Sequence, residues 1–233
     1  MPENAYAAGA LRTRELGPPS RGPSGASPLS ALALAGVCAL TLAVIWLIAE
    51  LVPAAHFKDA VALHEITTLS RPRLDSVARF LLRLLEPGLY ILWGVALVAV
   101  ALAREQRRLA VAVVAILGLS PLSAEILKPL LAHSHDQVGY VQIGPASWPS
   151  GHSTAAAALA FSALLIAPRA YRGAVAAAGV SFVLAVSGSL LLLAWHMPSD
   201  VLAGWFLAGL WTCLAVAGLR FAERRRPSAQ VAP

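Results

Sequence analysis

The sequence contains few charged residues and almost no cysteine. Only 13% of its 233 residues are Asp, Glu, Lys or Arg and 7% are aromatic, whereas 58% are hydrophobic. So little charge excludes an ordinary soluble domain, and the length leaves no room for several domains. Cys38 and Cys213 stand singly inside apolar runs, which argues against a disulfide framework or a cysteine metal site and favours small core or lipid-facing positions. The composition therefore predicts one integral membrane domain.

Six apolar runs approach the length that a membrane-spanning helix needs. We expect helices over residues 29–52, 89–103, 109–127, 153–167, 173–194 and 201–219. The first run exceeds the core of a signal peptide, so we interpret it as a retained span. The predicted fold is all-α, a six-helix membrane bundle over 29–220 between a disordered tail at 1–28 and a basic tail at 221–233. Periodicity alone would also allow five or seven helices. In helix 201–219, Gly204 and Ala208 form a small-residue face suited to close packing.

The segment between the first two predicted membrane helices, residues 56–86, is mixed in character. Arg71-Pro72 should interrupt any helix there. Beyond it, apolar residues recur at intervals of three and four while charged residues occupy another face, a pattern typical of a helix lying in the membrane interface. We interpret the segment as a surface loop capped by this amphipathic turn, in preference to a substrate gate. The charged residues of the turn are Asp75, Arg79 and Arg83.

Positive charge gathers beside particular apolar runs. Twelve of the 18 Lys and Arg lie in the two terminal segments and in the connections at 104–108 and 169–172. A net charge of +6 in a soluble protein would suggest a nucleic-acid partner, but membrane topology explains this clustering more simply, and we expect no nucleic acid. The positive-inside rule places both termini in the cytoplasm, in what we take to be a bacterial plasma membrane.

Three short polar segments interrupt the apolar runs, each at a predicted helix end. Lys128 closes the third run, Pro-Ser-Gly-His at 149–152 leads into the fourth, and His196 and Asp200 precede the sixth. A Pro-Ser-Gly turn entering a helix directs several backbone N–H groups at one spot, which suits an anion. His196 and Asp200 share one face of a turn because they are four residues apart. All three segments fall on the outer side of the predicted membrane and could form one site.

These residues resemble the three signature motifs of the type 2 phosphatidic acid phosphatase (PAP2) superfamily, which also includes the vanadium haloperoxidases. The resemblance covers Lys128 to Gly204, about a third of the chain. The second motif, at 149–152, matches completely. The third keeps a serine at 189, a histidine at 196 and an aspartate at 200 with the family's spacing.

Two arginines of the family motifs are absent. His135-Asp136 stands where the first motif has Arg-Pro, and Leu190 stands where arginine follows the serine of the third. We therefore expect weak or narrowly selective activity that Leu190→Arg and His135→Arg would each improve. His135 would replace part of the missing charge if a dianionic ligand favours its protonated form. Arg79 or Arg83 could supply more if the interfacial helix folds over the site.

The resemblance also implies a role for each site residue. His196 would be the nucleophile that forms a phosphohistidine, Asp200 would hold its other ring nitrogen, and His152 would protonate the leaving group. The residues expected to bind the phosphoryl oxygens are Lys128, Ser150, Gly151, His135 and Ser189.

An HxH pair, His133 and His135, lies near Asp136 and suggests a metal site as an alternative. Such a site needs three or four ligands of defined geometry. We favour a polar loop without metal, because the chemistry that the resemblance implies needs none, and we expect no cofactor.

The leading functional hypothesis is a membrane phosphatase that acts on a lipid phosphate or a polyprenyl or other lipid diphosphate at the outer leaflet. Its partners would be that substrate and the bilayer, and the sequence indicates no oligomeric state. Transfer of the phosphoryl group to an acceptor other than water is a related possibility. The alternative is a catalytically impaired member that binds anionic lipid or acts as a membrane partner, which the missing arginines favour.

Overall fold

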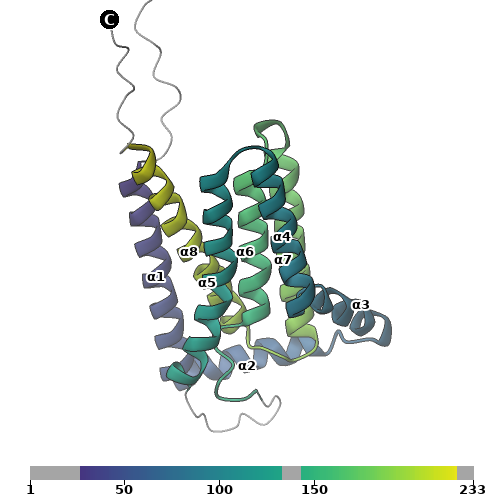
Figure 1. Cartoon of the computed structure of the whole chain (residues 1–233). Helices are drawn as coiled ribbons and strands as arrows, with labels where there is room; N and C mark the ends of the chain where they lie inside the picture. Colours follow the sequence, from purple (N-terminus) through teal and green to yellow (C-terminus); the bar gives the residue numbers. More distant parts are fainter. Residues whose placement is uncertain (1–26, 133–142, 225–233) are drawn as a thin grey trace, which may run out of the picture.

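The computed structural model describes residues 27–132 and 143–224, and all regular structure in these ranges is helical. Two helices, α2 (Pro53–Thr67) and α3 (Pro72–Arg83), lie across one end of a bundle of longer helices (Figure 1). A short 3-10 helix, η1 (Arg169–Tyr171), precedes α7. The bundle helices are α1 (Pro28–Leu51), α4 (Pro87–Ala103), α5 (Arg107–Leu131), α6 (Gly151–Ile166), α7 (Arg172–Leu192) and α8 (Pro198–Arg224).

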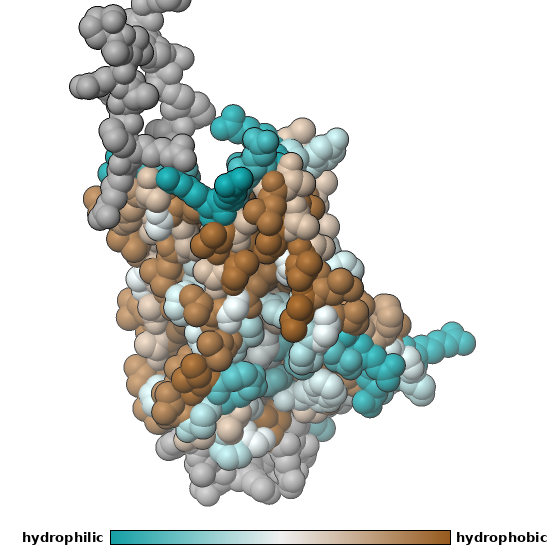
Figure 2. All heavy atoms as spheres, in the orientation of Figure 1, coloured by the Kyte–Doolittle hydropathy of each residue, from teal (hydrophilic) through white to brown (hydrophobic). Residues whose placement is uncertain are grey.

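Most of the bundle helices can cross a membrane. Helices α1, α5, α7 with η1, and α8 are each long and apolar enough, while α3 and α4 meet the same test as one pair bent by 57°. Helix α6 is apolar but has only 16 residues. On the face that Figure 2 shows, hydrophobic side chains cover most of the middle and polar ones gather toward the ends. The chain is therefore an all-α integral membrane protein as predicted, and the count of six spans stays a prediction.

Proline marks the start of five helices in the described ranges. Its fixed φ suits the first helical position, where the N–H it lacks would have no partner inside the helix. At α1, Ser27 adds a cap, since its side chain accepts the N–H of Ser30 at 3.0 Å. The five prolines are Pro28, Pro53, Pro72, Pro87 and Pro198.

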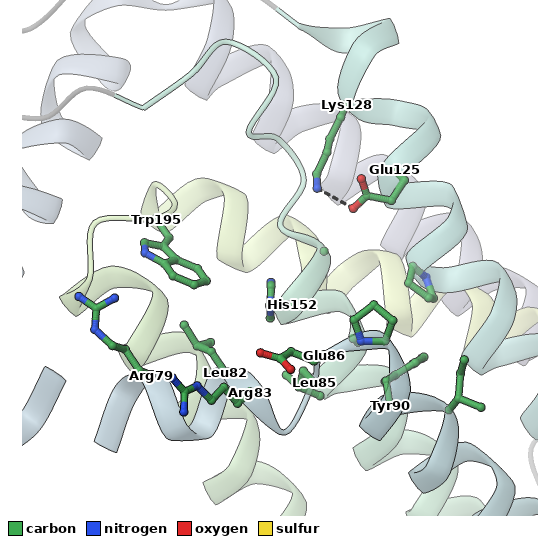
Figure 3. A pocket seen from close by; sticks show the side chains of 15 residues that line it. Arg79, Leu82, Arg83, Leu85, Glu86, Tyr90, Glu125, Lys128, His152 and Trp195 are labelled. Carbon is green, nitrogen blue, oxygen red and sulfur yellow. Dashed lines mark hydrogen bonds and ion pairs between the residues drawn. The ribbon is translucent and has the colours of Figure 1, made fainter. Parts of the chain in front are cut away.

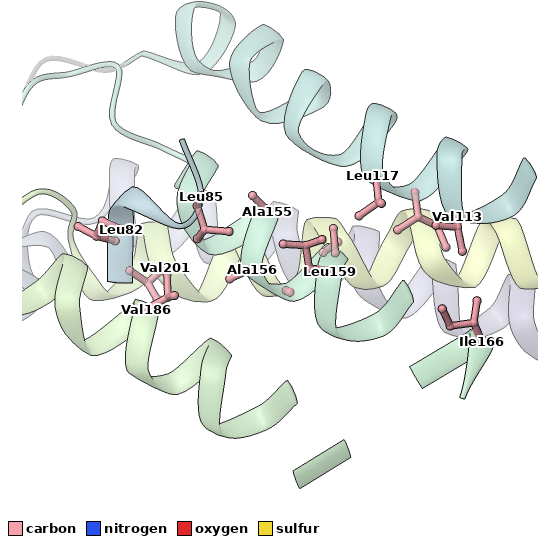
Figure 4. Close-up of a cluster of buried hydrophobic side chains, with 14 of the residues drawn as sticks. Leu82, Leu85, Val113, Leu117, Ala155, Ala156, Leu159, Ile166, Val186 and Val201 are labelled. Atoms are coloured by element: carbon pink, nitrogen blue, oxygen red, sulfur yellow. The ribbon is translucent and has the colours of Figure 1, made fainter. Parts of the chain in front are cut away.

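Helix α6 lies inside the bundle and packs against α4, α5, α7 and α8. Its alanine-rich sequence lets neighbours approach closely, and its side chains join the main apolar cluster (Figure 4). Helices α6 and α8 approach each other closely at Gly204 of α8, where an added Cβ would lie 2.9 Å from the Ser150 carbonyl oxygen and from the Thr154 nitrogen. Ala208, four residues later, is fully buried. The close packing predicted for this small-residue face is confirmed, and it sets α8 against the start of α6.

The prediction of a surface loop at 56–86 is wrong, because the segment folds into α2 and α3 with a break just before Pro72. The sequence of 53–67 has no clear apolar periodicity to indicate a helix, and tertiary contacts stabilise the helix that forms there. Its Ala60 and Leu63 are buried against Met197, which precedes α8. The amphipathic helix predicted after Arg71-Pro72 is present as α3.

Helix α5 continues past the expected end at 127 to Leu131, so Lys128 lies within its last turn. Helix α1, which carries Cys38, packs mainly on α8, which carries Cys213. Both cysteines are free, and Cys38 is buried as a core residue should be.

Candidate active site

The N-terminus of α6 is fixed by hydrogen bonds to the start of α8. Ser150 caps α6, because its Oγ accepts the Ser153 N–H at 3.4 Å, and its own N–H donates to the Asp200 carbonyl at 3.1 Å. The Ser153 hydroxyl donates to the Val201 carbonyl at 2.7 Å. Both serines are fully buried. These bonds join the second polar segment to the third and place the positive end of the α6 dipole at His152.

A Schellman turn ends α7 and leads the chain into the third polar segment. The Trp195 N–H donates to the Leu190 carbonyl at 2.9 Å, and the Ala194 N–H donates to the Leu191 carbonyl at 3.1 Å. Ala194 has φ of 52°, a left-handed conformation that costs a residue with a Cβ roughly 1–2 kcal/mol. The turn places the Trp195 ring edge-on to His152, with ring centroids 5.9 Å apart.

Asp200 orients His196. The Nδ1 atom of His196 lies 3.1 Å from Asp200 Oδ2, and the same oxygen accepts the Met197 N–H at 3.0 Å. Asp200 is the third residue of α8, so its bond to the residue before the helix is the return half of a capping box. Because Nδ1 faces the carboxylate, Nε2 is the ring nitrogen left for any contact with a ligand.

Lys128 approaches the start of α6 together with an acid. Its Nζ lies 2.6 Å from Glu125 Oε1, one turn earlier in α5. A Cβ added at Gly151 would lie 2.9 Å from that oxygen and 3.6 Å from Nζ. Glycine at this position therefore makes room for the ion pair beside the helix N-terminus. The first polar segment meets the second, but its lysine charge is balanced by a carboxylate.

A cavity of about 740 Å³ opens at this point of the bundle (Figure 3). Its walls come from α3, from the start of α4, from the ends of α5 and α6 that meet there, and from Trp195. His152 lies between Lys128 on one side and Arg79 and Arg83 on the other. The described residues that line the cavity do not include His196.

Five of the predicted site residues fall into two groups. His152, Gly151 and Lys128 line the cavity, while His196 and Asp200 contact each other. The roles assigned to all five stay predictions.

The side chains of two predicted phosphate ligands bond elsewhere. Ser150 is the buried cap of α6, and the Ser189 hydroxyl donates to the Ala185 carbonyl at 2.8 Å within α7. His135 and the HxH pair lie outside the described residues. Within 27–132 and 143–224, no three His, Cys, Asp or Glu side chains gather as metal ligands.

Sequence reasoning did not single out Glu86, Tyr90 and Glu125, which also line the cavity. The Tyr90 hydroxyl donates to the Leu117 carbonyl at 2.9 Å and joins α4 to α5. Glu125 stands three residues before Lys128, a helical spacing that could have indicated their ion pair. Nothing in the sequence pattern indicates that Glu86 and Tyr90 meet the motif residues, because they precede the motifs by tens of residues.

Asp59 of α2 was also missed, although it supports the third polar segment. Its Oδ2 accepts the Ser199 hydroxyl at 2.6 Å and the Ser199 N–H at 3.3 Å. Burial raises the pKa of the Asp59 carboxyl above its ordinary value of 3.8, an effect that the bonds from Ser199 partly oppose and the nearby charge of Asp200 adds to. Helix α2 therefore holds the residue next to Asp200 in place.

The fold and these residues define a helical membrane protein in which His152 lies at the positive end of a helix and His196 contacts a buried aspartate. The family model described as the PAP2 superfamily matches residues 109–224, which contain α6, α7, α8 and all but the first two residues of α5. The chain belongs to the PAP2 superfamily.

A solved structure has the same fold. It is a transmembrane PAP2-type phosphatidylglycerolphosphate phosphatase from Bacillus subtilis, with a TM-score of 0.61 and 19% sequence identity over 87% of this chain and 98% of that one. No curated protein sequence matches this chain.

Proposed function

We propose that this protein removes phosphate from a lipid phosphate or lipid diphosphate at the membrane surface, through a phosphohistidine on His196. The observation that carries the proposal is the 3.1 Å contact between His196 and Asp200 beside a cavity that contains His152. Membership of the PAP2 superfamily and the fold of the Bacillus subtilis phosphatase support the same chemistry.

Each chemical step has a side chain to perform it. His196 Nε2 attacks phosphorus while the bond to the leaving oxygen breaks, and that oxygen takes a proton from protonated His152. Asp200 stabilises the charge on the His196 ring. In the second step His152 removes a proton from water, whose oxygen attacks phosphorus and releases His196. The positive end of α6 and Lys128 balance the charge on the phosphoryl oxygens.

An apolar groove beside the cavity supports a lipid as the substrate. The groove lies between α4 and α5, has a volume of about 450 Å³, and shares Tyr90 and Ile91 with the cavity. A hydrocarbon chain in this groove would remain at lipid depth while its phosphate lies at His152. The polar and apolar parts of a lipid phosphate thus each find a matching surface.

Two observations favour the alternative of an impaired, lipid-binding member. Glu125 already pairs with Lys128, and Leu190, in place of the family arginine, is completely buried. Both reduce the positive charge available to a phosphate. Phosphate release by the purified protein separates this alternative from an active enzyme.

The test is phosphate release by detergent-purified protein from a panel of lipid monophosphates and diphosphates. We expect activity that persists in EDTA, that His196→Ala abolishes, and that His152→Ala lowers by about 10²–10⁴-fold. Asp200→Asn should lower kcat more than it raises KM, because it leaves His196 in place without its charge partner. The melting temperature of each variant controls for folding. No release from any lipid by well-folded wild type would favour the lipid-binding alternative.

A further inference from the structure

The cavity carries cations from an element outside the matched family segment. Arg79 and Arg83 are one turn apart on α3, so they share a face of that helix, and both line the cavity. In Figure 3 they lie on one side of His152, and Lys128 lies on the other. The family model begins at residue 109, well after α3 ends.

The charges of the two arginines are not neutralised by other described residues. Within the described residues neither guanidinium makes a hydrogen bond or an ion pair, and both side chains are exposed to the cavity. Lys128 instead lies 2.6 Å from Glu125 Oε1. Glu86 adds a second carboxylate to the cavity wall. The cations ready to meet an anion are therefore those of α3 rather than the lysine.

Helix α3 holds these arginines in a fixed place. Its Ala78 and Leu82 are each 2% exposed, and the helix packs against α7. Leu82 belongs to the same buried cluster as Leu190 of α7, which is 0% exposed. An apolar residue at 190 thus forms part of the surface on which the arginine-bearing helix rests.

We propose that Arg79 and Arg83 bind the phosphate oxygens of the anionic lipid head group that enters the cavity, and so provide its main cationic contact. The assignment of a lipid phosphate rests on the proposed function. A guanidinium donates two parallel hydrogen bonds to a phosphate, which gives it more orientation and strength than an ammonium group provides. Two such groups on one helix face, opposite His152, can hold the head group while its phosphorus meets the histidines.

The test is the affinity of detergent-purified protein for dioctanoyl phosphatidate, measured in a His196→Ala background so that no turnover is needed. Arg79→Gln with Arg83→Gln should weaken binding by about 10- to 100-fold. Arg73→Gln is the matched control, because Arg73 is an exposed arginine of α3 that does not line the cavity, and it should change binding by less than about twofold. Binding of dioctanoylglycerol, which lacks the phosphate, should not change in any variant. Lysine at both positions should restore part of the affinity.

The outcomes separate this proposal from the proposed function. If wild type hydrolyses lipid phosphates but the double variant binds phosphatidate as tightly as Arg73→Gln does, the arginine assignment is overturned and the phosphatase stands. If wild type hydrolyses nothing but binding still depends on the two arginines, the phosphatase fails and the assignment stands. If phosphatidate binds no more tightly than dioctanoylglycerol, both fail.

Discussion

The carboxylate of Asp200 has fewer hydrogen bonds than its burial would ordinarily require. It is 0% exposed, its Oδ2 accepts two hydrogen bonds, and its Oδ1 is without a partner among the described residues. A buried oxygen left unbonded costs roughly 1–3 kcal/mol. A residue kept for stability alone would avoid that cost, so the arrangement supports the proposed role of Asp200 in balancing charge on His196.

The burial of Leu190 changes the effect that we expect from Leu190→Arg. The missing arginine suggested that Leu190→Arg would improve activity, but the leucine is 0% exposed within the apolar cluster that includes Leu82 and Val186. A guanidinium there would be buried without a partner, at a cost of several kcal/mol. We expect Leu190→Arg to lower both the melting temperature and kcat/KM on dioctanoyl phosphatidate.

Leu190→Met is the control for this substitution, since it keeps the volume and should cost less than about 1.5 kcal/mol. A Leu190→Arg protein that melts like wild type and turns over faster would mean that the arginine reaches the cavity, and the original expectation would then hold.

The His196–Asp200 contact and the burial of Leu190 differ in how well the sequence could predict them. The contact of His196 with Asp200 follows from a spacing of four residues and from local turn geometry, and both can be inferred from the sequence. The burial of Leu190 depends on which face of α7 meets α3, and that is decided by packing between segments about a hundred residues apart.

Helices α2 and α3 are the elements that sequence reasoning described least well. The membrane helices were predictable within a few residues because long apolar runs leave the backbone no other way to satisfy its hydrogen bonds in lipid. Helix α2 has no such signal, and contacts of Ala60 and Leu63 decide its structure. The arginines of α3 were noted in the sequence, but only the packing of α3 on α7 places them at the cavity.

The hydrogen bonds from Ser199 of α8 to Asp59 of α2 predict that the stability of the protein depends on pH. Because the pKa of Asp59 is raised by burial, its protonated form stabilises the fold fully below the ordinary value of 3.8, and that contribution is lost as pH rises through the folded value. Asp59→Asn stays neutral and keeps an oxygen that can accept from Ser199. Its melting temperature should exceed that of wild type by an amount that grows as the pH rises from about 4 through the raised pKa of Asp59 and stays constant above it.

Thermal unfolding of both proteins in detergent across this range is the measurement, with Asp59→Ala as the control that removes the bond to Ser199. A difference between Asp59→Asn and wild type that stays constant with pH would show that the charge of Asp59 is not responsible.

The whole molecule has two polar ends with different composition. At one end Arg104 donates to the Ile166 carbonyl, and Arg108 donates to the Ala222 carbonyl at 3.0 Å, so cationic side chains close the ends of α6 and α8. The other end carries the cavity, α2 and α3. The connections at 104–108 and 169–172, whose cations were used to predict the orientation, lie at the end of the bundle opposite α2 and α3 (Figure 1).

This architecture makes the orientation testable with one cysteine at each end. Ala146 lies just before the second motif at the cavity end, Ala170 lies in η1 at the other, and both are exposed. In a protein whose Cys38 and Cys213 are replaced by alanine, Ala146→Cys should react with a membrane-impermeant maleimide in intact cells. Ala170→Cys should react only after permeabilisation, because the positive-inside rule places its arginine-rich end in the cytoplasm. The reverse pattern would put the cavity on the cytoplasmic side, and labelling of both from outside would contradict a bundle that spans the membrane.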